Sequence, residues 1–344
     1  MTDDEMTDDE AMTRAIERAQ AVRHRTSPNP WVGAVLITTD GRVFAGATQP
    51  PGGDHAEIQA LRAAGDAAKG ATVFTTLEPC SHVGRTGPCA EALADAGVAR
   101  VVVGIEDPDL NVAGRGVALL RRRGVEVRVG VLAVRVEAQL APYLKHRRTG
   151  RPWVVLKLAA SLDGRTAAPD GSSQWITGEA ARTDAHRLRA QSDAIIVGAG
   201  TVRADDPKLT VRLPEAEQPH REPLRVVLGA VPVDAAVQPS LQLDGPLEGV
   251  LDQLGERGVL QAMVEGGAGV AGAFHRAGLV DHYVLYLAPV LFGGDDAQGV
   301  FAGAGAPSIA EVWRGQIQAM EQLGGDLRID LAPAPAQAPE EVAA

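Results

Sequence analysis

Short apolar runs rich in Val, Ile and Leu alternate with stretches of helical periodicity along most of the sequence. In the first half, strand-like runs cover residues 31–48 (two strands joined at Asp40-Gly41), 71–77, 99–107 and 125–132. Helical patterns cover residues 10–25, 55–64, 88–96 and 114–124. Such alternation is typical of α/β domains, in which helices cover a layered sheet. The sequence therefore predicts an α/β fold.

A second series of the same kind follows a basic connector, KHRRTGRP, and the length of 344 residues suits two domains. We expect one domain over residues 10–145, a linker over 146–152 and another domain over 153–331. The acidic lead-in (1–9) and the Pro/Ala-rich tail (332–344) are expected to be disordered.

Charge and composition restrict the class of partner. The formal net charge is −11 and aromatic residues make up 3% of the chain, which disfavours binding to nucleic acid or to an anionic membrane. No apolar run reaches the roughly 18 residues that span a bilayer. The start, MTDDEMTDDEAM, does not resemble a signal peptide. We expect a cytoplasmic protein without a structural disulfide. The negative charge does not exclude a small phosphorylated ligand, which needs only a few local Arg, Lys or backbone N–H groups.

The chain has two cysteines, and both follow a His-Ala-Glu sequence. His55, Cys80 and Cys89 supply three zinc ligands and leave a fourth position open for water, while Glu57 is placed to move protons. Zinc deaminases have this order of residues, although eight residues here separate cysteines that are usually separated by two. The alternatives are two buried cysteines that only fill the core, or iron in place of zinc.

Longer motifs carry a specific resemblance. TSPNPWVGAVL, PPGGDHAEIQAL, TLEPCSHVGRTGPC, KLAASLDGRTA, LRAQSDAIIVGAGTVRADDPKLTVR and VEGGAGVAGAF occur in one order between about residues 10 and 330. They resemble the bifunctional deaminase–reductase family of riboflavin biosynthesis. The resemblance implies a cytidine-deaminase-like three-layer domain followed by a dihydrofolate-reductase-like α/β domain. It also implies zinc-dependent deamination of a phosphoribosylamino-pyrimidine and then NADPH-dependent reduction of its ribosyl group.

For the deaminase half, the resemblance implies that Glu57 transfers protons and that other residues bind the substrate. These binding residues are Asn29, His82, Arg85, Asp107 and Asp109. Arg85 suits a phosphate and the aspartates suit ribose hydroxyls. Asp109 departs from the family pattern, in which Asn often follows the Asp-Pro.

For the reductase half, no G-x-G-x-x-G follows the first strand, so the cofactor is expected at the glycine-rich turn of VEGGAGVAGAF. By resemblance, the cofactor contacts are Ala159, Trp175, Thr201, Asp205, Gly266, Gly267, Ala268, Gly269, Val270, Ala271, Gly272 and Ala273. The substrate contacts are Ser173, Arg189, Leu209, Arg212 and Glu265. Lys157 and Asp205 are the candidates to assist protonation.

Gly229 stands where the family usually has Asp or Ser after LRVVL, so one cofactor contact is in doubt. This leaves an alternative: a deaminase whose second domain is degenerate and only binds ligand or assembles subunits. A homo-oligomer, either dimer or tetramer, is expected, with the apolar segment VDHYVLYLAPVLF as a candidate for pairing between subunits.

Overall fold

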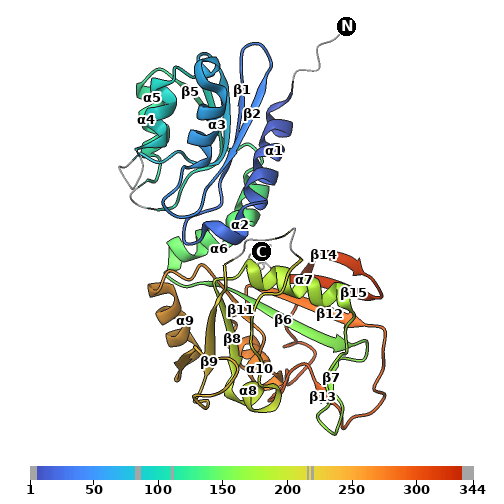
Figure 1. Cartoon of the computed structure of the whole chain (residues 1–344). Coiled ribbons are helices and arrows are strands. Elements are labelled where there is room, and N and C mark those ends of the chain that lie inside the picture. Colours follow the sequence, from blue (N-terminus) through green and yellow to red (C-terminus); the bar gives the residue numbers. More distant parts are fainter. Residues whose placement is uncertain (1–5, 82–86, 110–111, 215–216, 218–220, 335–344) are drawn as a thin grey trace, which may run out of the picture. The chain divides into compact units, whose positions relative to one another are not determined.

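The computed structural model describes residues 6–81, 87–109, 112–214, 217 and 221–334. The chain divides into two compact units, residues 1–151 and 152–344 (Figure 1). Helix α6 (Ala133–Thr149) continues without a break into the expected linker, and strand β15 (Asp326–Pro333) reaches into the expected tail. Within the described residues, no helix combines the length and apolarity that crossing a membrane requires.

The first unit contains a five-stranded sheet. Its strands, in spatial order, are β2 (Val43–Ala47), β1 (Gly33–Ile37), β3 (Thr72–Leu77), β4 (Arg100–Ile105) and β5 (Glu126–Val129). β1 runs antiparallel to both β2 and β3, whereas β3, β4 and β5 are parallel. β3 and β4 are almost wholly buried, as expected for strands covered on both faces.

Helices cover this sheet on two sides, which makes three layers (Figure 1). They are α1 (Asp8–Gln20), α2 (Arg23–Thr26), α3 (Ala56–Ala64), a 3₁₀ turn η1 (Gly65–Ala68), α4 (Cys89–Asp95), α5 (Arg115–Arg122) and α6. α3 contacts α4 and α4 contacts α5, while α1 contacts α6. Gly46 allows α3 to approach β2 closely, because a Cβ there would lie 2.1 Å from the Ala56 carbonyl oxygen. The single helix expected over residues 10–25 is divided into two helices, α1 and α2.

The second unit contains an eight-stranded sheet. Its strands, in spatial order, are β10 (Leu241–Leu243), β9 (Leu224–Leu228), β8 (Ala194–Gly198), β11 (Gln261–Val264), β6 (Trp153–Ser161), β12 (His282–Ala288), β15 and β14 (Gly315–Leu323). The first six are parallel, β15 runs antiparallel to β12, and β14 runs antiparallel to β15. A small ribbon pairs β7 (Arg165–Ala167) with β13 (Gln298–Gly299).

The helices of the second unit are α7 (Glu179–Ala190), α8 (Ala199–Asp205), α9 (Leu247–Glu256) and α10 (Ala268–Arg276). Leu188 of α7 packs with Val155 and Met263, whereas Leu254 of α9 and Phe274 of α10 pack in a separate core cluster. Strand β8 ends at Gly198, and α8 begins at the next residue. α8 and α10 both start where parallel strands end, so the carboxyl edge of the sheet carries two helix N-termini.

Candidate active sites

The three predicted metal ligands come together in the first unit. The ligand atoms of His55, Cys80 and Cys89 lie within 4.8 Å of one another. The Nδ1 atom of His55 is 3.6 Å from the Cys80 Sγ and 3.3 Å from the Cys89 Sγ. Around a tetrahedral zinc, a nitrogen and a sulfur ligand are separated by roughly 3.5 Å, given the usual bond lengths. Two thiols and one imidazole at these separations therefore fit zinc.

Local structure explains why the ligands converge. His55 is the N-cap of α3 and Cys89 is the first residue of α4, and these helices contact each other. The Cys89 amide donates a hydrogen bond to the Cys80 Sγ at 3.3 Å. Hydrogen bonds from Cys89 and His55 lower the pKa of the Cys80 thiol below its usual value and outweigh the effect of burial. A thiolate is the form of cysteine that binds metal.

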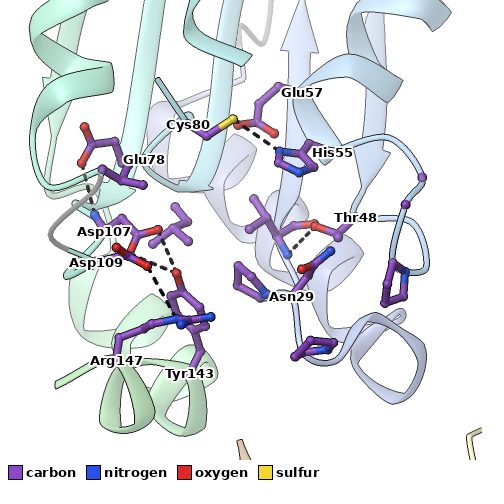
Figure 2. A pocket seen from close by; sticks show the side chains of 18 residues that line it. Asn29, Thr48, His55, Glu57, Glu78, Cys80, Asp107, Asp109, Tyr143 and Arg147 are labelled. Atoms are coloured by element: carbon purple, nitrogen blue, oxygen red, sulfur yellow. Dashed lines mark hydrogen bonds and ion pairs between the residues drawn. The ribbon is translucent and has the colours of Figure 1, made fainter. Parts of the chain in front are cut away.

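Glu57 lies beside this cluster on the first turn of α3, and Figure 2 shows it next to His55 and Cys80. Its side chain is buried, with 3% of the residue exposed. Burial raises the pKa of the Glu57 carboxyl to about 7, although His55 opposes that change. A carboxyl group with a pKa near neutrality can both accept and release a proton at physiological pH.

A cavity of about 530 Å³ opens onto the cluster. Asn29, Asp107 and Asp109 line it, together with His55, Glu57 and Cys80 (Figure 2). Burial raises the pKa of Asp107, even though hydrogen bonds to it act in the opposite direction. The predicted ligands His82 and Arg85 lie outside the described residues.

Four polar residues of the same cavity were absent from the sequence-based prediction. They are Thr48, Glu78, Tyr143 and Arg147. Glu78 precedes the Pro-Cys motif, which was the one local signal available for it. Tyr143 and Arg147 are four residues apart and share one face of α6, a helix that the sequence patterns did not predict.

The second unit has a cavity of about 520 Å³ at the carboxyl edge of its sheet. Predicted residues in its lining are Lys157, Ala159, Ser173, Thr201, Asp205, Glu265, Gly266, Gly267, Ala268, Gly269 and Val270. A Cβ on Gly266 would lie 2.5 Å from the Val270 Cβ, and the Gly267 amide donates to the Thr201 Oγ1 at 3.1 Å. The turn therefore keeps backbone exposed beside the N-terminus of α10, an arrangement that fits a phosphate-bearing cofactor.

A buried ion pair lies next to this cavity. The Arg189 Nε and Nη2 atoms donate to the Glu265 carboxylate at 2.5 and 2.8 Å. Burial alone would raise the pKa of Glu265, but Arg189 lowers it below its usual value. Burial, together with Arg189, lowers the pKa of Lys157. Lys157 thus lies in an environment that favours release of its proton.

Other predicted residues of the second unit do not line the cavity. Trp175 is 66% exposed, with the Arg182 guanidinium 4.8 Å from its ring centroid, so it is not a core residue. Leu209 is buried with Val202, and the exposed Arg212 donates its amide to His186 Nδ1 at 3.2 Å.

The last part of the glycine-rich segment also lies away from the cavity. Ala271 belongs to the hydrophobic core, and a Cβ on Gly272 would lie 2.3 Å from the Ala302 carbonyl oxygen. Ala273, on the same helix, is absent from the cavity lining. The physical reason is helical periodicity: only the first turn of α10 faces the cavity, and the next turn packs against the protein.

Comparison with known proteins agrees with the division of the chain into two units. Residues 5–105 match the model of the cytidine and deoxycytidylate deaminase zinc-binding region, and residues 152–328 match that of the RibD C-terminal domain. The riboflavin biosynthesis protein RibD of Mycobacterium tuberculosis is 46% identical over 94% of this chain and 96% of its own. This chain belongs to the RibD family. RibD of Escherichia coli is 41% identical over 96% of this chain and 100% of its own.

Solved RibD structures have the same fold throughout. RibD of Acinetobacter baumannii matches with a TM-score of 0.89 at 38% identity, covering 95% of this chain and 99% of that one. A Thermotoga maritima protein matches with a TM-score of 0.85 at 32% identity and the same coverage. It is described as a diaminohydroxyphosphoribosylaminopyrimidine deaminase/5-amino-6-(5-phosphoribosylamino)uracil reductase. The predicted two-domain α/β fold is confirmed, and this RibD protein is a bifunctional enzyme of riboflavin biosynthesis, both deaminase and reductase.

Proposed function

We propose that the first unit hydrolytically deaminates 2,5-diamino-6-(5-phosphoribosylamino)pyrimidin-4-one. The second unit then reduces the ribosyl side chain with NADPH to give 5-amino-6-(5-phosphoribitylamino)uracil. The observation that carries the proposal is the convergence of His55, Cys80 and Cys89 beside the buried Glu57. The likeness to the Thermotoga maritima protein, whose description names both activities, supports the choice of substrate.

In the deaminase, His55, Cys80 and Cys89 would hold zinc, which when bound supplies Lewis-acid activation of water. Glu57 accepts a proton from the attacking water and passes it to a ring nitrogen. It then moves the remaining hydroxyl proton to the amino group, which leaves as ammonia. A pKa of about 7 suits both halves of that transfer. Asn29 orients the pyrimidine, while Asp107 and Asp109 accept hydrogen bonds from ribose hydroxyls. His82 and Arg85 are proposed to bind the remaining polar groups, including the phosphate.

In the reductase, NADPH when bound supplies the hydride. Gly266 and Gly267 leave their backbone open to its phosphates, and Thr201 and Asp205 line the same cavity. Ser173 and Glu265 would contact the substrate, with Arg189 and Arg212 as partners for its phosphate. The lowered pKa of Lys157 supports a role in proton delivery as hydride reaches the sugar C1. Asp205 is the second candidate for that role.

The alternative of a degenerate second domain is not favoured. Its cavity retains the glycine turn, and the adjacent Arg189–Glu265 pair is intact. Gly229 has a φ of +95°, and a Cβ there would lie 3.3 Å from the Ala199 Cβ. Glycine therefore suits the backbone of this turn, although it offers no side chain to a cofactor.

The deciding experiment supplies the diaminopyrimidine substrate to zinc-loaded protein and follows ammonia release and NADPH consumption together. Ammonia release followed by NADPH loss is expected. Ammonia without NADPH loss, even when the deaminated intermediate is added directly, would reduce the proposal to the deaminase half. Folded, zinc-loaded protein that gives neither signal would contradict the substrate assignment.

We also propose that the protein is a cytoplasmic homo-oligomer. The segment favoured by sequence contains β12, which is an inner strand, so edge pairing of this sheet would use β10 or β14, and we favour β14. Ile317 and Met320 of β14 are 60% and 63% exposed, an apolar surface that a second copy could cover. Light scattering should show a dimer or tetramer that Met320→Lys weakens. Cell fractionation tests the cytoplasmic location, where both cysteines should be found reduced.

A further inference from the structure

The carboxylate of Asp107 is fixed from two directions at the wall of the metal-binding cavity. The Tyr143 hydroxyl donates to its two oxygens, at 3.1 Å to Oδ1 and 3.0 Å to Oδ2. The Asp109 amide donates to Oδ1 at 2.9 Å. An ionised carboxylate has about four acceptor positions, so these bonds fix its plane and still leave capacity for a ligand. Figure 2 shows Tyr143 approaching Asp107 from α6.

Glu78 holds the backbone of the same segment. Its carboxylate accepts hydrogen bonds from four amides, those of Asp107 (3.2 Å), Gly114 (2.9 Å), Gly116 (2.8 Å) and Val117 (3.1 Å). Glu78 is 4% exposed and stands two residues before the metal ligand Cys80. The backbone of Asp107 is thereby tied to the metal-binding segment. The orientation of its carboxylate, by contrast, is set by the Asp109 amide and by the hydroxyl of Tyr143, which is the side-chain donor of the two.

Tyr143 is well suited to act as a permanent donor. It is 4% exposed, and burial, together with the neighbouring Asp107, raises the pKa of its hydroxyl above the usual value. The Arg147 guanidinium lies 5.1 Å from the ring centroid. The ring therefore has packing partners of its own, and its hydroxyl can be removed while those contacts stay.

We propose that Tyr143 is a positioning residue of the deaminase, whose hydroxyl holds the Asp107 carboxylate in the orientation that receives a hydroxyl of the substrate's sugar. This inference rests on the proposed function, in which Asp107 contacts the ribosyl group. A role limited to packing α6 would need the ring of Tyr143 and not its hydroxyl.

The first test is Tyr143→Phe in the full-length, zinc-loaded protein. Loss of a hydrogen bond to a charged group is expected to raise the deaminase KM for the phosphoribosyl substrate about tenfold, with a smaller change in kcat. Zinc content and reductase turnover of the deaminated intermediate should stay at wild-type values. Tyr283→Phe is the matched control, since it removes a hydroxyl that bonds His275 Nδ1 at 2.9 Å in the second unit. It should leave the deaminase KM unchanged.

The second test places Tyr143→Phe in an Asp107→Ala background. If the hydroxyl acts through Asp107, the added change should alter KM less than twofold, because no carboxylate remains to be oriented. An equal loss in both backgrounds, an unchanged KM in the single variant, or loss of zinc from it would each overturn the proposal. Wild-type protein that releases no ammonia would overturn the proposed function and this inference together.

Discussion

The two cavities are similar in size but differ in what builds them. The first collects side chains: an imidazole, the Cys80 thiol and several carboxyl groups line one space, and the buried Cys89 completes the metal-binding group. The second also has polar side chains in its lining, but it is richer in glycine, and its glycines are Gly171, Gly198, Gly200, Gly266, Gly267 and Gly269. Deleting a functional group should therefore damage the first site, whereas adding a methyl group should damage the second.

The largest effect is expected from Glu57→Gln, which keeps the shape of the side chain and removes its ability to accept a proton. Deaminase kcat should fall about 10²- to 10⁴-fold, because general acid–base catalysis contributes that much. The measurement is ammonia release at matched zinc content. Reductase turnover of the deaminated intermediate should be unchanged, and a parallel loss of it would mean that the two sites are not independent.

Glu265→Gln tests whether side chains matter in the second cavity too. The Arg189 side chain is only 15% exposed, and the change removes the carboxylate that pairs with its charge. Leaving this buried charge unpaired should destabilise the fold by about 3–5 kcal/mol. Denaturant unfolding measures this loss. The control is Glu217→Gln, whose partner Arg187 is 45% exposed, so less than about 1 kcal/mol should be lost. Equal losses in the two variants would contradict the difference in burial.

Gly266→Ala tests the backbone character of the second cavity. The new Cβ would overlap Val270, and the resulting shift of the turn should weaken NADPH binding about tenfold. Calorimetry without substrate measures this directly. Gly249→Ala in α9 is the matched control, because a Cβ there would meet no described atom within 4 Å beyond its own helix and the residue does not line the cavity. If both variants bind NADPH as tightly as wild type, close approach of the turn's backbone to the cofactor does not contribute to binding.

The smallest effect concerns acid stability of the second unit. Burial opposes ionisation of Asp330, but hydrogen bonds from His282 and Arg328 outweigh it and lower its pKa to about 2. Because this pKa is below the unfolded value of 3.8, ionised Asp330 stabilises the fold above about pH 4, and the contribution is lost as the pH falls towards 2.

Asp330→Asn should therefore lower the thermal midpoint at pH 6, and the difference from wild type should shrink between pH 4 and pH 2. Tryptophan fluorescence reports this unit through Trp153, Trp175 and Trp313. The exposed Asp295→Asn serves as the control. A difference that stays constant with pH would show that Asp330 acts through packing and not through its charge.

Sequence patterns predicted most of the regular elements and the metal cluster, but they missed α6 and the β14–β15 hairpin. Buried residues of α6 recur at helical spacing, at Val136, Leu140, Tyr143 and Leu144, yet Pro142 lies among them. In β14 nearly every residue is exposed, so the strand lacks the alternation that marks a half-buried strand. α6 packs against α1 and β4, and the hairpin joins the sheet through the pairing of β15 with β12, so both elements depend on partners distant in sequence.

Sequence by itself determined the chemistry of the first site, because histidine and cysteine are rare in this chain, and His55, Cys80 and Cys89 stand with Glu57 in a fixed order near helix starts. It also determined the glycine turn of the second site. Only the tertiary structure decided that Glu78 and Tyr143 hold Asp107, and that Ala271 and Gly272 face the core. The physical reason is that motifs specify local backbone and reactive groups, whereas packing decides which face of each helix meets a cavity.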